Sequence, residues 1–510
     1  MVYVPTTYQI SPSSCHFYAS SVYLCLAIAS KDSMNIEVGI EQLLRLVFLL
    51  NLPLAIYIML KVVLNNRNPV KTVAWILVLF FLPLLGLLLY FFFGWDTRRL
   101  RYINKRSLSQ IQRRSKLSYP EHITPDIPAN YAGLISFFEN SADAHLTGHT
   151  TVDIINNGQD FMQALLREVS EAKEHIHLMF YIFEDDATGH ALRDALVEKA
   201  REGVEVRVIY DSVGCWSVKT SFFDEIRKAG GYVASFLKVR FPLLTNKINY
   251  RNHRKVVVID GKVGFVGGFN VADRYVTGGK WNEWRDTMLV LRGSAVYGLQ
   301  ITFLVDWFFA DSSLVSGKRY FPALNHDKGA LAQIVTSNPV GYCRTIMSGL
   351  TISLLNAKNY VYIQTPYLMP NDTVLMAIQN AAQSGVDVRL MIPLRADSRI
   401  ADYAAYSYLG ELLNVGVKVY LYEKGFLHSK MLVADDMLST VGSANLDFRS
   451  FYYNFEVNAY IYDANVASRL KAMFMEDIKS CRQLTLREYK ERPMSRRCLE
   501  SGARLLSPLL

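Results

Sequence analysis

The chain has 510 residues, a formal net charge of +9 and six cysteines. This length allows two domains of ordinary size, each able to bury its own core, and the basic balance suits either nucleic acid or anionic lipid headgroups as partners. The cysteines are scattered, with no C-x-x-C spacing. That pattern argues against a disulfide framework or a zinc site and predicts free thiols in a reducing compartment.

Residues 1–40 are expected to form an N-terminal extension. The stretch from Cys15 to Ser30 is mildly apolar, but no positively charged segment precedes it, which argues against a secretory signal. Two alternatives remain for this extension. It is either a short segment at a membrane interface or the result of an upstream translation start, with Met34 as the initiator, and the second is slightly favoured.

Residues 41–95 are predicted to form a two-helix transmembrane hairpin. The segment from Thr72 to Phe93 contains no charged residue and, as one helix, is long enough to cross a bilayer core. The segment from Leu43 to Leu64 is the other predicted span, with Arg45 and Lys61 near its ends, where long side chains can reach the interface. A hairpin buried in a globular core is the alternative, and this composition disfavours it.

The charges that flank the hairpin predict its orientation. Lys61, Arg67 and Lys71 lie at the turn, whereas the other side carries a larger basic set: Lys31, Arg45, Arg98, Arg99, Arg101, Lys105 and Arg106. Because positive flanks stay in the cytoplasm, the chain after the hairpin should be cytoplasmic. Residues 96–140 then form a basic, polar connector that contains three prolines.

Residues 141–325 and 326–485 are predicted to be two copies of one α/β lobe. Gly203 to Arg207 reads Gly-Val-Glu-Val-Arg, and Gly385 to Arg389 reads Gly-Val-Asp-Val-Arg. Each follows an amphipathic helical stretch, residues 191–200 and 374–382, and each opens an apolar run typical of a strand. Units that recur in the same order imply a sandwich built twice, with a pseudo-twofold axis between the lobes.

Both lobes carry the pattern H-x-K-x4-D-x6-G-[GS]-x-N. Its residues are His253, Lys255, Asp260, Gly267, Gly268 and Asn270 in the first lobe, and His428, Lys430, Asp435, Gly442, Ser443 and Asn445 in the second. On a strand, residues two apart face the same way, so His and Lys can converge on one phosphate. The duplicated motif resembles that of the phospholipase D superfamily, in which two such motifs build a single phosphodiesterase site.

The chemistry of phosphodiesters requires these residue types. A phosphodiester anion repels nucleophiles, so catalysis depends on positioning and on neutralising charge. One imidazole, predicted from the resemblance to be that of His253, can form a covalent phospho-histidine while that of His428 protonates the leaving alkoxide. The two lysines with Asn270 and Asn445 are expected to bind the non-bridging oxygens, so no metal ion or other cofactor is predicted.

The acidic residues near the motif are predicted to have two different roles. The superfamily motif includes Asp260 and Asp435 in its catalytic set, but their odd spacing from His makes them face away from it on a regular strand. A structural role, tying strand end to loop, is therefore expected. The resemblance instead points to Glu456 as the residue that orients the histidine of the second half, and Asp286 is its nearest equivalent in the first.

The two motifs differ at one position. Gly268 stands where the superfamily usually has serine, whereas Ser443 keeps the hydroxyl and is a predicted substrate-binding residue. The first half should therefore lack one hydroxyl near the phosphate.

Residues 486–510 form a basic C-terminal tail that ends Ser-Pro-Leu-Leu. The tail is either a basic interfacial helix or a solvated surface. With the hairpin and the segment from Tyr250 to Lys255, it makes the chain resemble bacterial cardiolipin synthases of the phospholipase D type. The resemblance implies two tandem phospholipase D-like lobes behind an all-α transmembrane hairpin in the bacterial inner membrane. It further implies phosphatidyl transfer from one phosphatidylglycerol to another, with anionic lipids as partners.

Two other activities could use the same motif residues. A hydrolytic phospholipase D would use water as acceptor, and another phosphatidyltransferase would use a different alcohol. A nucleic-acid partner is not expected, because a nuclease has no use for a membrane anchor. A catalytically inactive scaffold is excluded by intact His and Lys in both motifs.

Overall fold

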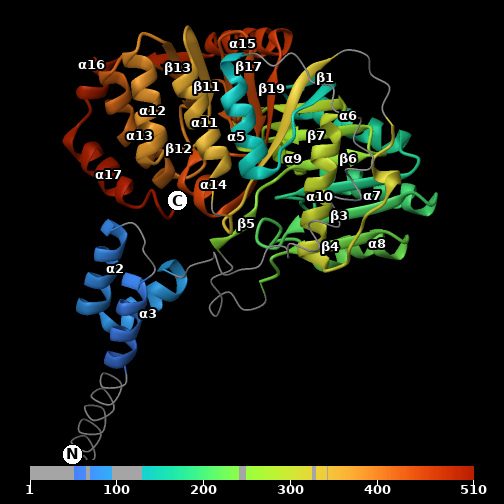
Figure 1. Ribbon diagram of the computed structural model, residues 1–510, viewed down its shortest axis with the longest axis horizontal. Coiled ribbons are helices and arrows are strands. Elements are labelled where there is room, and N and C mark those ends of the chain that lie inside the picture. Colours follow the sequence, from blue (N-terminus) through green and yellow to red (C-terminus); the bar gives the residue numbers. More distant parts are fainter. Residues whose placement is uncertain (1–50, 65–68, 95–128, 240–248, 324–328, 342) are drawn as a thin grey trace, which may run out of the picture. The chain divides into compact units, whose positions relative to one another are not determined.

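The computed structural model describes residues 51–64, 69–94, 129–239, 249–323, 329–341 and 343–510 (Figure 1). The chain divides into two units, residues 1–96 and residues 97–510. The predicted extension, residues 1–40, and the connector as far as residue 128 lie outside the described residues.

The N-terminal unit is helical where it is described. Residues 51–64 are helical, followed by α2 (Pro69–Phe81), α3 (Pro83–Leu89) and the π-helical turn η1 (Tyr90–Gly94). A small core of Val62, Leu79 and Tyr90 joins these helices. Most of their other large apolar side chains are exposed, among them Leu64 at 79% and Phe81 at 71%.

The prediction of one continuous helix from Thr72 to Phe93 is wrong. The helix breaks between Phe81 and Pro83, where Leu82 has φ −130° and ψ 62°. The residue before a proline is disfavoured in the helical region, and proline has no N–H to donate. Within the described segments, no helix has both the length and the apolar character needed to cross a membrane.

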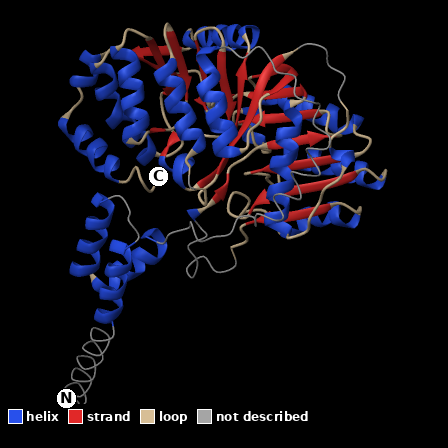
Figure 2. Ribbon diagram, in the orientation of Figure 1, coloured by secondary structure: helices blue, strands red, loops and turns tan. Residues whose placement is uncertain are grey.

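A single mixed sheet of 16 strands runs through the described part of the second unit (Figure 2). Its order is β20-β14-β13-β11-β16-β17-β19-β10-β1-β9-β7-β6-β2-β3-β4, and β5 pairs with β19 off this path. The central strands β1 and β10 pair antiparallel. Outward from them the order β9-β7-β6-β2-β3-β4 in the first lobe matches β19-β17-β16-β11-β13-β14 in the second. The two lobes are therefore one repeated topology joined into a continuous sheet.

The first lobe has these bounds: β1 Thr147–Ile155, α6 Gly158–Glu171, β2 His175–Phe180, α7 Ala187–Arg201, β3 Glu205–Asp211, α8 Asp224–Lys228, β4 Tyr232–Phe236, β5 Arg251–Asn252, β6 Val256–Ile259, β7 Val263–Gly267, α9 Asp273–Thr277, β8 Trp284–Arg285, β9 Met288–Gly293 and α10 Ala295–Asp311. The helical stretch predicted at residues 191–200 is confirmed as part of α7.

The second lobe has these bounds: β10 Ala330–Ser337, α11 Thr345–Asn356, β11 Tyr360–Gln364, β12 Leu368–Met369, α12 Asp372–Gln383, β13 Asp387–Pro393, α13 Arg399–Asn414, β14 Lys418–Tyr422, β15 Phe426–Leu427, β16 Met431–Ala434, β17 Leu438–Gly442, β18 Leu446–Asp447, α14 Phe448–Tyr452, β19 Asn454–Tyr462, α15 Ala464–Ile478, β20 Cys481–Leu484, α16 Leu486–Lys490 and α17 Met494–Leu505. The predicted helix at residues 374–382 is confirmed within α12.

Strand alternation sends apolar side chains to both faces of the sheet. On β6, Val256 and Val258 join a core that includes α10, α15 and strands of both lobes, whereas Val257 and Ile259 join the core under α6 and α7. On β16, Met431 faces the shared core and Leu432 faces the core under α11 to α13. The shared core therefore fixes the two lobes to each other and positions the segments that precede β6 and β16.

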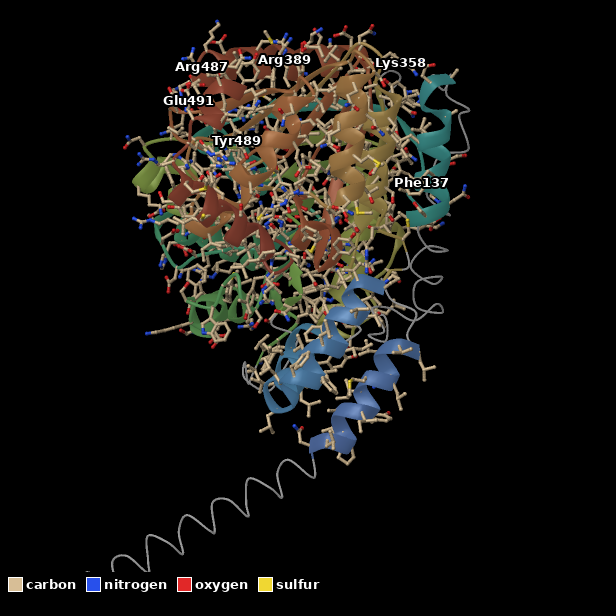
Figure 3. All side chains as sticks on the ribbon, turned by 90° about the vertical axis from the view of Figure 1, so that its left-hand side faces the viewer. Phe137, Lys358, Arg389, Arg487, Tyr489 and Glu491 are labelled. Carbon is tan, nitrogen blue, oxygen red and sulfur yellow. The ribbon has the colours of Figure 1, made fainter. Side chains whose placement is uncertain are left out.

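Both ends of this unit pack on the second lobe. The helix α5 (Ala132–Ala142) brings Phe138 against Tyr460, with ring centroids 4.4 Å apart. The predicted C-terminal tail forms α16 and α17, and α17 packs on α13 and buries Glu500 and Ala503. Figure 3 shows Phe137 on α5 and the row Arg487, Tyr489 and Glu491 at the opposite side of this lobe.

Candidate active site

The two motif histidines lie at the seam between the lobes, each held by the opposite lobe. Strand β5 pairs with β19, and the His253 backbone N–H donates to the Phe455 carbonyl at 2.9 Å. Strand β15 pairs with β8 in the same way, and the His428 N–H donates to the Arg285 carbonyl at 2.7 Å. These short parallel pairs cross the seam, so each histidine is placed beside backbone of the other repeat.

The carboxylate partners of the histidines are crossed in consequence. His253 Nδ1 lies 3.0 Å from Glu456 Oε2, and His428 Nδ1 lies 2.6 Å from Asp286 Oδ2. The expected pairing within each half, Asp286 with His253 and Glu456 with His428, is therefore wrong. The prediction failed because β5 pairs with a strand of the second lobe and β15 pairs with a strand of the first lobe. In both pairs the carboxylate engages Nδ1 and leaves Nε2 for the reacting group.

Both carboxylates are fully buried, with 0% exposure. Burial alone would raise the pKa of Asp286, but Lys430 and His428 lower that pKa below its ordinary value. Burial would likewise raise the pKa of Glu456, but His253 and Lys255 lower that pKa below its ordinary value. Both residues are thus held as anions that can fix the imidazoles in one orientation.

Burial also lowers the pKa of each imidazole. The pKa of His253 falls below its ordinary value because burial outweighs the opposing charge of Glu456. For His428, burial and the neighbouring Lys430 lower the pKa to about 3. Both rings are therefore neutral at pH 7 when no anion is bound, and a neutral imidazole is the state that a nucleophile needs. A phosphodiester anion between them would raise both values.

The two motif lysines are buried with the histidines. Lys255 Nζ donates to the His253 carbonyl at 2.6 Å, and Lys430 Nζ donates to the His428 carbonyl. Burial lowers the pKa of Lys255 to about 7 and that of Lys430 to about 8. Each ammonium is therefore close to losing its proton near neutral pH.

These lysines predict a pH dependence. An ammonium group is charged below its pKa and attracts phosphate, and above that pKa the attraction is lost. We expect kcat/KM for a phosphodiester substrate to fall as the pH rises through the values of about 7 and 8 that burial imposes on Lys255 and Lys430. The check is the pH profile of kcat/KM at constant ionic strength. A profile that stays flat through this range would contradict the assignment.

Asp260 and Asp435 lie away from the reacting groups, at the far ends of β6 and β16. The Asp260 carboxylate accepts backbone N–H bonds from Lys173, Glu174 and His175 at 2.8–2.9 Å. Asp435 does the same for Lys358, Asn359 and Tyr360 at 2.7–3.0 Å. These contacts anchor the start of β2 and the start of β11, as expected for a structural role. Neither carboxylate contacts a motif histidine.

The difference between Gly268 and Ser443 matches the difference between Asp286 and Glu456. The Ser443 hydroxyl donates to Glu456 Oε2. A Cβ placed on Gly268 would lie only 2.0 Å from Asp286 Oδ1. The shorter aspartate thus occupies the space that a serine side chain would need, and glycine is required beside it.

The two motif asparagines are engaged differently. Asn270 accepts the Ile182 N–H at 3.1 Å and donates to the Tyr275 hydroxyl at 2.7 Å. Asn445 donates from Nδ2 to Asp447 Oδ2 at 3.2 Å, while its own Oδ1 is buried without a partner among the described residues. Each amide has one N–H left for a phosphate oxygen, so the expected phosphate contact stays a prediction.

Both histidines and both motif asparagines line one cavity of about 450 Å³. The cavity is lined by Tyr181, Ile182, Arg251, His253, Asn270, Arg274, Tyr275, Trp284, Tyr367, Met369, Asp397, Ser398, Ala401, His428, Asn445, Asp447, Arg449, Asn454 and Leu510. The described residues contain no group of three or more His, Cys, Asp or Glu side chains placed to hold a metal ion.

Sequence reasoning missed Arg254, which lies between the motif His and Lys. Arg254 is 1% exposed and forms an ion pair with Asp306 of α10, with Nη1 2.6 Å from Oδ1. Its Nε also donates to the Glu456 carbonyl at 3.0 Å. Arg254 therefore ties the first motif both to the shared core and to the strand that carries the crossed carboxylate. A buried charge next to a motif lysine gives no periodic signal that could have identified it.

Two family models match the chain. The model described as "Cardiolipin synthase, PLD-like domain" matches residues 165–299 and 350–478, and the model described as "Phospholipase_D-nuclease N-terminal" matches residues 50–95. The two parts of the first match fall in the two repeated lobes.

Curated relatives match over most of the chain. It is 42% identical over 479 residues to the major cardiolipin synthase of Bacillus subtilis, covering 92% of this chain and 99% of that protein. It is 40% identical over 481 residues to cardiolipin synthase 1 of Staphylococcus aureus (strain COL), covering 92% and 97%. Among solved structures, the phosphatidylserine synthase of Haemophilus influenzae Rd KW20 matches with a TM-score of 0.56 and 12% identity, over 74% of this chain and 100% of that one. That last likeness concerns the fold alone.

Proposed function

The chain belongs to the cardiolipin synthase family of the phospholipase D superfamily, and on that premise we propose that it transfers a phosphatidyl group from one phosphatidylglycerol to another. The products are cardiolipin and glycerol. The observation that carries the proposal is the seam, where two imidazoles line one cavity and each is fixed through Nδ1 by a buried carboxylate. The two motif ammonium groups are buried beside them, each against the carbonyl of its motif histidine.

The reaction proceeds by two displacements at phosphorus. His253 Nε2 attacks the donor phosphate and forms a P–N bond while the P–O bond to glycerol breaks. The bound phosphodiester anion raises the pKa of His428, whose Nε2 takes up a proton and passes it to the departing oxygen. An acceptor hydroxyl then attacks the phospho-histidine, its proton passes to His428, and the P–N bond breaks. Lys255 and Lys430 neutralise the non-bridging oxygens throughout.

The N-terminal unit is the proposed membrane anchor of a protein of the bacterial inner membrane. Its helices leave many large apolar side chains exposed, more than a soluble surface ordinarily carries, and residues 50–95 match the N-terminal family model. The flanking charges support a cytoplasmic location for both lobes. It stays a prediction that both apolar segments of residues 41–95 cross the membrane. An anchor of this kind holds the seam at a surface rich in acceptor lipid.

Liposomes of phosphatidylglycerol test the proposed function. Transfer requires a site that excludes water and a high local concentration of acceptor lipid, so we expect cardiolipin and glycerol in equal amounts, with phosphatidic acid minor. Because one phosphodiester replaces another, the reaction has little driving force, and added glycerol should suppress cardiolipin. Dominant phosphatidic acid in intact bilayers would identify a hydrolase. Products with another added alcohol, in preference to cardiolipin, would identify a different transferase.

Chelation is a further test of how the site neutralises phosphate. The site offers two lysines and two amides for the non-bridging oxygens, so turnover should persist in EDTA. The measurement is cardiolipin formation before and after chelation, in neutral detergent micelles. Micelles are used because divalent ions also change the surface of anionic membranes. Complete loss of turnover, restored by one specific divalent ion, would contradict the mechanism.

A further inference from the structure

The helix α17 and the residues that follow it expose large apolar side chains to solvent. These side chains are Met494, Leu499, Leu505, Leu506 and Leu509, and Leu505 is 81% exposed. In the described part of the second unit, no other stretch of equal length exposes as many. A concentration of exposed apolar groups on one surface indicates a contact site.

The face of α17 that packs on α13 carries charges. Glu500 is buried there and forms ion pairs with Arg492 and Arg496, with N–O distances of 2.8 and 3.0 Å. Arg504 pairs with Glu411 of α13 at 2.6 Å. A helix on the surface of a soluble domain ordinarily turns its apolar side inward and its polar side outward. In α17 the outer face is the apolar one, so it requires another explanation than contact with water.

Two basic grooves flank α17. The first groove, of about 560 Å³, contains Arg492, Arg497 and Arg504, and the second, of about 490 Å³, contains Arg395, Arg482 and Arg496. They lie on opposite sides of the helix, because residues 497, 501 and 504 line the first groove whereas residues 495 and 499 line the second. Asp372 and Glu500 in the first groove and Asp402 in the second leave both with an excess of positive charge. Since Arg497 and Arg395 form no ion pair with another described residue, each groove has one guanidinium available to an anion.

The apolar surface continues to the active-site cavity. The backbone N–H groups of Leu509 and Leu510 donate to the Leu506 carbonyl at 2.8 and 3.2 Å, so these residues turn back at the end of α17. Leu510 lines the cavity that also contains His253 and His428. The exposed Leu509 is therefore the direct chain neighbour of a residue of the cavity wall.

We propose that α17 and residues 506–510 form a surface that docks on an anionic phospholipid bilayer beside the active site. The exposed leucines enter the boundary between headgroups and acyl chains, and lipid phosphates occupy the two grooves beside Arg395 and Arg497. Because Leu510 joins this surface to the cavity wall, a phospholipid in the contacted bilayer has a short path to the two motif histidines.

An anionic bilayer is the occupant that fits both features of this surface. Its acyl region stabilises the apolar side chains, and its charged headgroups stabilise the basic grooves. A second copy of the chain fits less well, because a twofold contact would bring the same basic grooves from both partners to one interface. The proposal requires a phospholipid substrate, which membership of the cardiolipin synthase family supplies, and does not depend on the acceptor.

The first test uses the full-length enzyme in nanodiscs that hold one copy each. The environment-sensitive fluorescent residue dansylalanine replaces Leu505, and its emission is compared between discs of phosphatidylcholine alone and discs that also contain phosphatidylglycerol. We expect a blue shift in the anionic discs, because the probe leaves water, and a smaller shift in Arg395→Gln/Arg497→Gln. The matched control places the probe at Leu355 of α11, which is 52% exposed and lines neither groove, and its emission should be the same in both kinds of disc.

Activity gives an independent measurement of docking. Leu505→Ser/Leu509→Ser should lower glycerol release from long-chain phosphatidylglycerol in bilayers by at least about tenfold, since two apolar groups no longer enter the bilayer. Glycerol release from dissolved dihexanoyl-phosphatidylglycerol should equal that of the wild type, because this substrate reaches the cavity from solution. Leu355→Ser should behave as the wild type with both substrates.

The absence of a blue shift at residue 505 would overturn the proposal. So would a shift that appears only in membranes with several copies of the enzyme, which would assign this face to a second copy. An equal loss of activity with both substrates would also overturn it, because the two leucines would then act on the cavity itself. A wild-type enzyme that releases no glycerol from either substrate would instead refute the proposed transfer, while the nanodisc emission would still decide docking. The two failures are therefore distinguishable.

Discussion

His428→Ala should reduce cardiolipin formation by at least about 10⁴-fold, because the variant loses the group that protonates the departing alkoxide and deprotonates the acceptor. His253→Ala should lose as much, since no phospho-enzyme can form. The double variant should be no worse than either single one, because the two imidazoles act as a unit. The measurement is conversion of radiolabelled phosphatidylglycerol in mixed micelles.

His190→Ala is the control for these variants. His190 is solvent-exposed, bonds Asp185 at 2.8 Å and lies outside the cavity, so its removal should leave turnover unchanged. Peptide mapping of the trapped intermediate should place the phosphate on His253. A label on His428 in the wild-type enzyme would reverse the two roles, and near-normal turnover of His428→Ala would refute the two-histidine mechanism.

Gly268→Ser restores the residue usual in the superfamily motif, and we expect it to inactivate the enzyme. The new Cβ would lie 2.0 Å from Asp286 Oδ1, so the carboxylate must leave its position beside His428 Nδ1. Loss of the carboxylate that orients a catalytic histidine costs up to about 10⁴-fold in comparable sites. The measurement is turnover of purified variant whose thermal unfolding confirms a folded second unit.

Asp286→Glu should partly rescue Gly268→Ser. The double variant places in the first lobe the same serine–glutamate pair that Ser443 and Glu456 form in the second. Gly133→Ser is the control, because a Cβ at Gly133 meets no atom within 4 Å. Wild-type activity in Gly268→Ser alone would show that Asp286 does not need the space beside Gly268. The explanation that glycine pairs with aspartate and serine with glutamate would then be wrong.

The sequence was a good guide to features set by short-range periodicity. His253 and Lys255 lie two residues apart, so their convergence follows from strand geometry, and the repeated glycine–strand units correctly predicted the repeated lobes. The crossed carboxylates could not be predicted in this way. They depend on two-residue strands that pair across the seam, as β5 does with β19, and such short pairings leave no periodic pattern in the sequence.

Two other outcomes show where local rules compete. Apolar composition predicted one helix through residues 72–93, but Pro83 interrupts it, and the backbone rule for the residue before proline was the stronger signal. Gly268 was expected only to remove a hydroxyl. Its actual importance is the space it leaves for Asp286, which becomes evident only when residues 18 positions apart are brought into contact.

The crossed pairs also bear on when activity can first arise during synthesis. His253 leaves the ribosome 203 residues before Glu456, its partner, and the first lobe alone holds a histidine without its carboxylate and a carboxylate without its histidine. A half-made chain emerging beside a bilayer therefore has neither dyad. Both dyads can therefore form only after β19, the strand that carries Glu456, has been made and has joined the shared sheet.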